Sequence, residues 1–235
     1  MSIDTPSRSF IRPDGKEKVT GAGRYTADLT FTGQLHAAFR YADHPHARIV
    51  RIDTTAAKAL PGVLAVVTHE DVPDVRYGGM AKDRRLFAKE MVLWEGDIVA
   101  GIAARTVEIA RQAAALIEVE YEVLPGASDY VANMDPNAVV LHPEWQSYTA
   151  DEALGRDGNI LGRSTIVKGD ADVAMAGADV VVKSRYVAEA AQGVPIEPRA
   201  VVAQWTGDSV TVWSSTQVPF AARSWVAETL QIPES

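Results

Sequence analysis

Two histidines lie two positions apart in the segment D-H-P-H-A-R, at His44 and His46, and imidazoles are common metal ligands. Alternate residues of a strand share one face, so a strand here would turn both rings the same way. A metal site needs three or four ligands, and the neighbouring sequence offers no third one. We therefore predict structural roles for both residues and no metal site. The other histidines are isolated and are expected at the surface or at its boundary: His36, His69 and His142.

Three glutamates occupy alternate positions of residues 118–123, E-V-E-Y-E-V. Two neighbouring carboxyl groups could act as a general acid and a general base. In a strand, however, the glutamates form one face, while Val119, Tyr121 and Val123 form the other. The pattern predicts a solvated acidic face opposite a buried apolar one, and not a catalytic pair.

A basic cluster lies within residues 73–90, where the polar composition and Gly78-Gly79 predict a long surface loop. We interpret its members as solvated rather than as a binding patch: Lys82, Arg84, Arg85 and Lys89. The chain contains no G-x-S-x-G, Walker, H-E-x-x-H or EF-hand motif. The residue types alone therefore assign no catalytic residue.

The most unusual segment is A-A-Q-G-V-P-I-E-P-R, residues 190–199, which interrupts two strand-like stretches. Proline removes a ladder hydrogen bond and is costly inside a sheet. Residues 192–198 are therefore predicted to form an irregular loop or bulge at the end of a strand. Loops held by a rigid scaffold often carry function, which makes this segment a candidate site.

The composition is that of a globular protein, with 47% hydrophobic and 23% charged residues. A formal net charge of −8 argues against nucleic acid as a partner. No run approaches the ~18 apolar residues that a membrane span requires, and the first residues lack the apolar core of a signal peptide. The chain has no cysteine, which excludes disulfides and thiolate metal sites on it. We expect a cytoplasmic location.

Strands alternate with helices between residues 33 and 125, which predicts an α/β or α+β domain. Expected strands cover 34–41, 47–53, 63–68, 97–104 and 118–123, and expected helices cover 54–60 and 107–117. Thr106 can cap the second helix. The buried face of the first strand is expected to consist of Leu35, Ala37, Phe39 and Tyr41.

The two ends of the chain carry other patterns. Residues 1–17 are expected to form an extended arm, and Gly21 and Gly23 a structural turn, since no helix follows as a dinucleotide fingerprint requires. After a crossing segment, further strands are expected at 163–168, 179–191, 199–205 and 209–214, with a short helix after Gly169-Asp170. A terminal helix begins at Pro219, ends before Pro233 and has the apolar face Ala222, Val226 and Leu230.

Taken together, the chain resembles the molybdenum-containing large subunit of the xanthine dehydrogenase and aldehyde oxidase family, the molybdenum hydroxylases. The matching stretches cover nearly the whole chain in the family's order. They include V-T-G-A-G-R-Y-T-A-D-L, H-P-H-A-R-I-V-R-I-D, L-P-G-V-L-A-V-V-T, E-G-D-I-V-A-G-I-A-A, I-E-V-E-Y-E-V-L-P, K-G-D-A-D-V-A-M-A-G-A-D-V-V-V, Q-G-V-P-I-E-P-R, A-Q-W and S-S-T-Q-V-P. Each stretch is weak by itself, and the ordered set is specific.

The resemblance implies an α+β chain. Residues 1–18 would be an N-terminal arm, 19–125 an α/β hammerhead domain and 126–162 a connecting segment. Residues 163–235 would be the N-terminal part of the first molybdopterin-binding domain. The family's glycine-rich cofactor loop and catalytic glutamate match nothing in this chain, so the resemblance implies an N-terminal piece that is inactive alone and binds no cofactor or metal by itself.

The same resemblance implies the function of the assembled enzyme. It would oxidise a small molecule, an aldehyde or an aromatic N-heterocycle, with molybdopterin-bound molybdenum and with water as the oxygen source. FAD and [2Fe–2S] clusters would lie on partner subunits or domains, and the remainder of the molybdenum subunit would be a further partner. A non-catalytic structural or assembly module derived from the family is the alternative.

Four residues match positions that have a role in the family. Gln192, Gly193 and Glu197 would lie near the substrate funnel, and the glutamine, where purine-hydroxylating members have a glutamate, disfavours a purine substrate. Gln217 would lie on the approach to the cofactor loop, where it shapes a turn.

Overall fold

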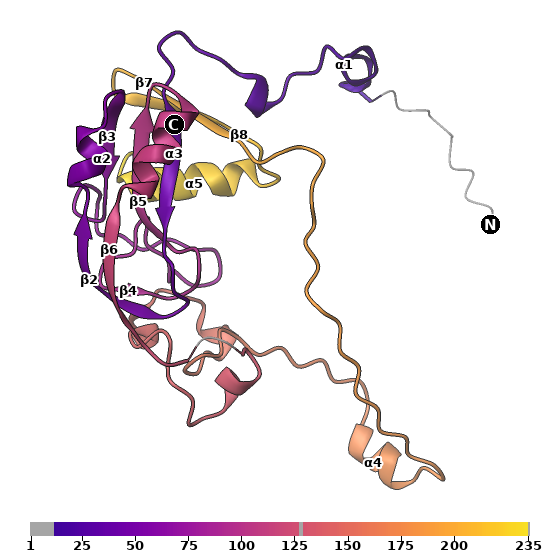
Figure 1. Cartoon of the computed structure of the whole chain (residues 1–235). Coiled ribbons are helices and arrows are strands. Elements are labelled where there is room, and N and C mark those ends of the chain that lie inside the picture. The colour runs from indigo at the N-terminus through magenta and orange to yellow at the C-terminus, as the bar shows by residue number, and fades with distance from the viewer. Residues whose placement is uncertain (1–11, 127–128, 235) are drawn as a thin grey trace. The chain divides into compact units, whose positions relative to one another are not determined.

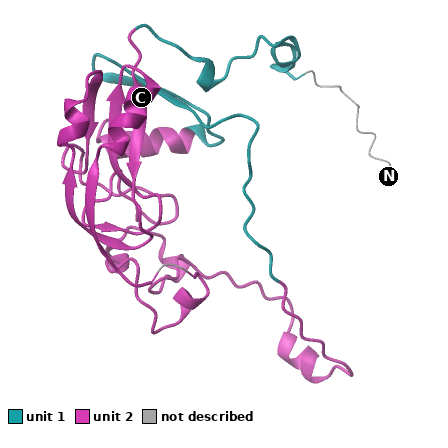
Figure 2. Cartoon of the chain, viewed as in Figure 1, with its two compact units in different colours: residues 1–32, 187–219 teal, residues 33–186, 220–235 magenta. Residues whose placement is uncertain are grey.

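The computed structural model of the chain describes residues 12–126 and 129–234 (Figure 1). The chain divides into two units, coloured separately in Figure 2. The larger unit comprises residues 33–186 and 220–235, and the smaller one residues 1–32 and 187–219.

Two three-stranded antiparallel sheets build the larger unit. The first has the order β1 (His36–Tyr41), β5 (Ile98–Ala104) and β3 (Val63–Val67). The second has the order β4 (Met91–Val92), β2 (Ala47–Asp53) and β6 (Glu118–Val123). Every pairing is antiparallel, so sheets combined with separate helices make this an α+β fold.

Helix α3 (Val107–Ala115) packs on β1 and β5, and the shorter helix α2 (Thr55–Ala59) packs on β3 and α3. The predicted cap is confirmed, because the Thr106 side chain accepts the amide of Ile109 at 3.3 Å. The core beneath the helices consists mainly of small side chains: Ala57, Val66, Ala100, Ile102, Ala113, Ala114 and Ile117. Small residues let the helix approach the sheet closely, which is the packing advantage of an alanine-rich face.

The predicted buried face of β1 is wrong. Phe39 is 42% exposed and Tyr41 48%, whereas Ala38 packs against the core. Alternation identifies two faces but does not decide which one the helix covers, and the close approach of α3 suits Ala38 better than an aromatic ring. Arg40 lies on the same face of β1 as Ala38, and its guanidinium donates to the Ile117 carbonyl oxygen at 3.2 Å.

The predicted acidic face of β6 is confirmed, with the three glutamates exposed. Glu122 forms an ion pair with Arg48 across the sheet at 3.0 Å. The apolar side is only partly buried, because Tyr121 is half-buried and Val123 is 61% exposed at the end of the strand. Burial of Val123 was therefore a wrong prediction, because this last residue of β6 lies where the strand leaves the packed part of the sheet.

Residues 129–162, here called the connecting segment, contain three short 3₁₀ turns, at Ala132–Met134, Trp145–Ser147 and Glu152–Leu154. The Asn159 side chain ties its two ends together. It accepts the Leu141 amide at 2.8 Å and donates to the carbonyls of Asn133 and Val139 at 3.0 and 2.9 Å.

The smaller unit contains a hairpin of β7 (Val201–Thr206) and β8 (Ser209–Ser214). Gly207 in its turn has φ +60°, a left-handed conformation that glycine adopts without strain. Phe31 stacks on Trp213 of the hairpin, with ring centroids 4.9 Å apart. The predicted hairpin is confirmed.

The extended arm is a wrong prediction for part of its length. Residues 15–20 form helix α1 (Gly15–Thr20), and Gly21 ends it in the left-handed conformation, φ +72°. The predicted turn at Gly21 is thereby confirmed. The part of the arm at residues 1–11 lies outside the described residues.

The strands predicted at 163–168 and 179–191 are also wrong, because both stretches have irregular backbone. Their apolar side chains face solvent, with Val180 78%, Val182 81% and Tyr186 90% exposed. A strand is stable only when a neighbour pairs with its backbone, and within the described residues only the Arg163 amide has such a partner, the Leu154 carbonyl at 2.8 Å. Between them, the predicted short helix exists as α4 (Ala171–Ala176), capped by Asp170.

Helix α5 (Pro219–Leu230) begins at the predicted proline. Its buried residues are Ala227 and Thr229, whereas Leu230 of the predicted apolar face is 37% exposed. No helix among the described residues is long and apolar enough to cross a membrane.

Candidate functional site

Both candidate histidines make structural contacts. His46 is 2% exposed, and its Nδ1 lies 2.7 Å from the Pro125 carbonyl oxygen. A carbonyl only accepts, so Nδ1 donates its hydrogen to it, and Nε2 is buried without a hydrogen-bond partner among the described residues. His44 packs edge-on against the Tyr121 ring, with centroids 5.2 Å apart. Within the described ranges, no group of three or more His, Cys, Asp or Glu side chains could hold a metal ion.

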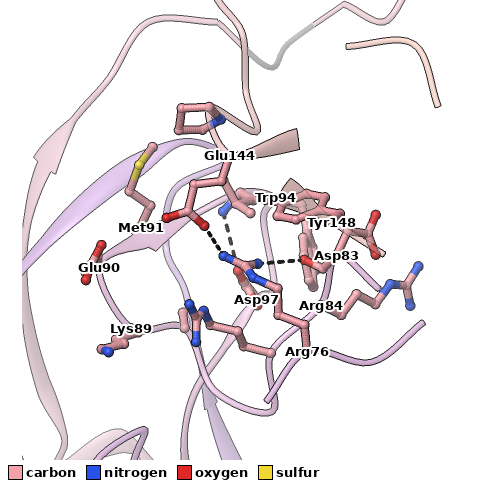
Figure 3. A pocket seen from close by; sticks show the side chains of 14 residues that line it. Arg76, Asp83, Arg84, Lys89, Glu90, Met91, Trp94, Asp97, Glu144 and Tyr148 are labelled. Atoms are coloured by element: carbon pink, nitrogen blue, oxygen red, sulfur yellow. Dashed lines mark hydrogen bonds and ion pairs between the residues drawn. The ribbon is translucent and has the colours of Figure 1, made fainter. Parts of the chain in front are cut away.

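A small pocket opens in the larger unit between the loop that follows β3 and the connecting segment (Figure 3). Its volume is about 120 Å³. Residues between 76 and 97 supply most of the lining, and Pro143, Glu144 and Tyr148 close it from the connecting segment.

Arg76 joins the two walls of this pocket. Its guanidinium forms an ion pair with Glu144, donates to the Asp83 carbonyl oxygen at 3.2 Å and lies 4.6 Å from the centroid of the Tyr148 ring. Figure 3 shows this arginine between Glu144 and Asp83. Because Arg76 and Glu144 are far apart in the sequence, periodicity and spacing give no signal for this pair.

The basic cluster is ion-paired, which corrects its interpretation as simply solvated. Arg85 and Lys89 share the Asp74 carboxylate, with Lys89 at 2.9 Å, and Lys82 pairs with Glu228 of α5. Arg84 forms no ion pair within the described part of the chain, and its guanidinium lies 6.0 Å from the centroid of the Trp94 ring. The carboxylates complete a network that stays near the surface, where each pair contributes about 0–1 kcal/mol.

Asp97, in the pocket lining, is a residue that sequence reasoning missed. It is 7% exposed, and burial raises its pKa to about 6. Its carboxylate accepts the Leu93 amide at 3.4 Å, and the charge of Arg84 opposes the rise. A single acid at the head of an apolar strand carries no sequence signature of burial.

The charges of the pocket balance. Four cationic side chains line it, and so do four carboxyl groups: Asp83, Glu90, Asp97 and Glu144. Its volume of about 120 Å³ is room for about four water molecules and lies below the ~300 Å³ typical of small-molecule sites. The arrangement suits a packed contact between loop and connecting segment better than a catalytic site.

The four residues implied by the family resemblance lie in the smaller unit. Gln192, Gly193 and Glu197 are exposed on irregular backbone, so the predicted irregularity is confirmed, although no strand precedes it. Val194 between them has φ +36°, a conformation that β-branched residues rarely adopt. Gln217 is exposed in a turn where the Thr216 hydroxyl accepts the Val218 amide at 3.1 Å.

These residues do not by themselves form a cradle for molybdopterin. None of the four lines the pocket of Figure 3, and none makes a side-chain hydrogen bond or an ion pair in the described structure. Gly193 would leave space for a close backbone approach, since an added Cβ meets nothing within 4 Å, but open solvent explains that equally well. The residues described here do not fit the group, and their assignment as site residues stays a prediction.

Comparison with known proteins places these features in a family. Residues 20–125 match the profile described as "Aldehyde oxidase and xanthine dehydrogenase, a/b hammerhead domain". Residues 154–235 match the profile "Molybdopterin cofactor-binding domain". The chain belongs to the xanthine dehydrogenase and aldehyde oxidase family of molybdenum hydroxylases.

Several relatives share most of this chain. A probable xanthine dehydrogenase subunit of Bacillus subtilis is 36% identical over 100% of the chain, which spans 30% of that protein. The nicotinate dehydrogenase large molybdopterin subunit of Eubacterium barkeri is 31% identical, and the match covers 97% of this chain and 51% of that one. The crystal structure of quinoline 2-oxidoreductase from Pseudomonas putida 86 matches 96% of this chain and 28% of its own, with a TM-score of 0.78 and 31% identity. The chain thus corresponds to between about a quarter and a half of the length of these proteins.

Proposed function

We propose that this chain forms part of the molybdopterin-binding subunit of a molybdenum hydroxylase that oxidises an aldehyde or an aromatic N-heterocycle. Water would supply the oxygen atom. The observation that carries the proposal is the order of two family matches, the hammerhead profile at 20–125 followed by the molybdopterin-binding profile at 154–235. A fold alone does not define a reaction, and the activities for which the relatives are named supply the substrate class by analogy.

The proposed enzyme carries molybdopterin in the complete subunit, with FAD and [2Fe–2S] clusters on partner subunits or domains. The names of relatives support the molybdopterin part of this proposal, since one is a large molybdopterin subunit and another a molybdenum-binding subunit of a dehydrogenase. The partners of the chain would be the remainder of the molybdenum subunit and the iron–sulfur and flavin subunits. We include a cytoplasmic location in the same proposal.

Within this enzyme the chain would supply scaffold and part of the access route. Residues 19–125 would form the hammerhead domain, 126–162 the connecting segment and 163–235 the first part of a molybdopterin-binding domain, after an arm at 1–18. Gln192, Gly193 and Glu197 would line the substrate funnel. Gln217 would shape the approach to the cofactor.

Purification of the tagged chain from its native cells, with whatever assembles on it, tests this proposal. Metal and flavin analysis should find molybdenum, iron and FAD in near-stoichiometric amounts. A dye-coupled assay should show oxidation of aldehydes or N-heterocycles. A complex that lacks molybdenum or turns over neither class would contradict the proposal and support a structural module.

The site assignment has its own test in the same complex. Glu197→Gln should raise the KM for the substrate, because a funnel carboxylate was removed. Glu189→Gln, an exposed glutamate outside the segment, is the matched control. Full activity with an unchanged KM in the first variant would reject the assignment without touching the proposed function.

A further inference from the structure

The larger unit contains a joint between two segments that are distant in the sequence, residues 76–84 of the loop after β3 and residues 142–150 of the connecting segment. The Lys82 amide donates to the Thr149 carbonyl at 2.9 Å, and Ala81 pairs with Ala150 in an isolated antiparallel bridge. Beside this backbone contact, Arg76 spans the joint to Glu144. The joint thus combines a backbone contact with a charged one.

His142 belongs to the connecting segment and contacts Tyr148 of the same segment. Its Nδ1 is 3.2 Å from the Tyr148 hydroxyl, and the two rings meet edge to face with centroids 5.8 Å apart. Tyr148 is 7% exposed and also carries the Arg76 guanidinium over its face, 4.6 Å from the centroid. One phenol ring therefore supports both an imidazole and a permanent cation.

The charged and titratable groups that face His142 come from three parts of the unit. Arg76 and Asp83 belong to the loop, His46 precedes β2 and Tyr148 belongs to the connecting segment. Burial lowers the pKa of His142; Asp83 raises it, while Arg76 and His46 lower it further. Only one of these neighbours carries a negative charge, and Glu144 is already paired with Arg76.

A proton on His142 would place a second positive charge beside Arg76 in a partly dry environment. Desolvation of that charge is the main cost, repulsion from Arg76 adds to it, and attraction to Asp83 offsets part of it. The sign follows from the direction of the shift. The closed joint binds the proton less well than an open one, so its stability is complete above the ordinary histidine pKa of 6.5 and falls as the pH drops below it.

We propose that His142 makes this joint a pH-sensitive contact: the neutral imidazole keeps the connecting segment bound to residues 76–84, and protonation in mildly acidic solution releases it. The inference does not depend on the proposed function. It concerns residues that neither family resemblance nor sequence motif singled out.

Hydrogen exchange on the full chain at pH 7.5 and pH 5.0, corrected for the intrinsic pH dependence of exchange, tests the proposal. The protection of the Lys82 amide should fall in acid, because the closed joint binds the proton on His142 less well than an open one. Amides of the β1–β5 ladder serve as the reference and should keep their protection. His142→Asn, which retains an acceptor for the Tyr148 hydroxyl but cannot take up the proton, should show equal protection at both pH values.

His36→Asn is the matched control, because this exposed histidine on β1 lies outside the joint. In this variant the Lys82 amide should lose as much protection in acid as it does in the wild type. If His142→Asn fails to fold, as judged by the β1–β5 amides, Arg76→Gln replaces it. That variant removes the cation that faces His142. Its Lys82 amide should therefore lose less protection between pH 7.5 and pH 5.0 than the same amide of the wild type. An acid loss that persists in His142→Asn or is unchanged in Arg76→Gln would overturn the proposal, as would a wild-type joint that is equally protected at both pH values.

Discussion

Replacement of Asp97 by asparagine should stabilise the larger unit at neutral pH and lose that advantage in acid. Asp97 is 7% exposed, and burial raises its pKa from 3.8 to about 6. The folded chain therefore binds a proton at this carboxyl more tightly than the unfolded chain. The contribution of Asp97 to the free energy of unfolding is therefore largest below the pKa of the unfolded chain, near pH 4. It falls as the pH rises towards 6 and is constant above that.

The size of the effect follows from the two pKa values. The interval from 3.8 to about 6 corresponds to at most about 3 kcal/mol at 1.36 kcal/mol per pH unit. About 2 kcal/mol of this is lost between pH 4.5 and pH 7.5. Asparagine keeps an acceptor for the Leu93 amide but has one oxygen fewer, which costs about 1 kcal/mol at every pH. The expected net gain of Asp97→Asn at pH 7.5 is thus about 1–2 kcal/mol.

Urea unfolding of the wild type and of Asp97→Asn at pH 4.5, 6.0 and 7.5 measures this difference. All other titrating groups are shared by the two proteins, so they cancel in the difference between the two unfolding free energies. Asp208→Asn, in the exposed hairpin turn, reports the effect of removing one surface charge. A difference that is independent of pH, or that favours the wild type at pH 7.5, would refute the reasoning from burial.

Further predictions concern single contacts and the isolated chain. Thr106→Ala should cost about 1 kcal/mol of unfolding free energy through loss of the α3 cap, whereas Thr54→Ala, at an N-cap without a side-chain hydrogen bond, should be nearly neutral in the same urea assay. Asn159→Ala removes three hydrogen bonds and should speed hydrogen exchange at the Leu141 amide by at least about tenfold; unchanged exchange would show that the connecting segment is held otherwise. The purified chain by itself should contain no molybdenum and oxidise no aldehyde, and near-stoichiometric metal with turnover would contradict this. It should also associate as its concentration rises, because α5 exposes the large apolar side chains Phe220, Trp225 and Leu230, and a monomer throughout a light-scattering series would count against that.

The local pattern of the sequence determined the elements whose signals are themselves local. The change of period at Thr106 and again at Glu118 placed α3 and β6 within two residues of where they lie. The turn residue Gly207 placed the hairpin, and Pro219 the start of α5. These features need only neighbouring residues, because caps, turns and alternating faces are made within a few positions of the chain.

Tertiary structure decided the features that depend on distant partners. It turned Ala38 rather than Phe39 towards the core, since α3 covers that face of β1. It left residues 179–191 without strand structure, because a valine-rich stretch does not form a strand in the absence of a hydrogen-bonding neighbour. It also buried Asp97 and brought Arg76 to Glu144, which lies 68 positions away. Burial and charge pairing are properties of position in space, and a linear pattern of residue types does not encode them.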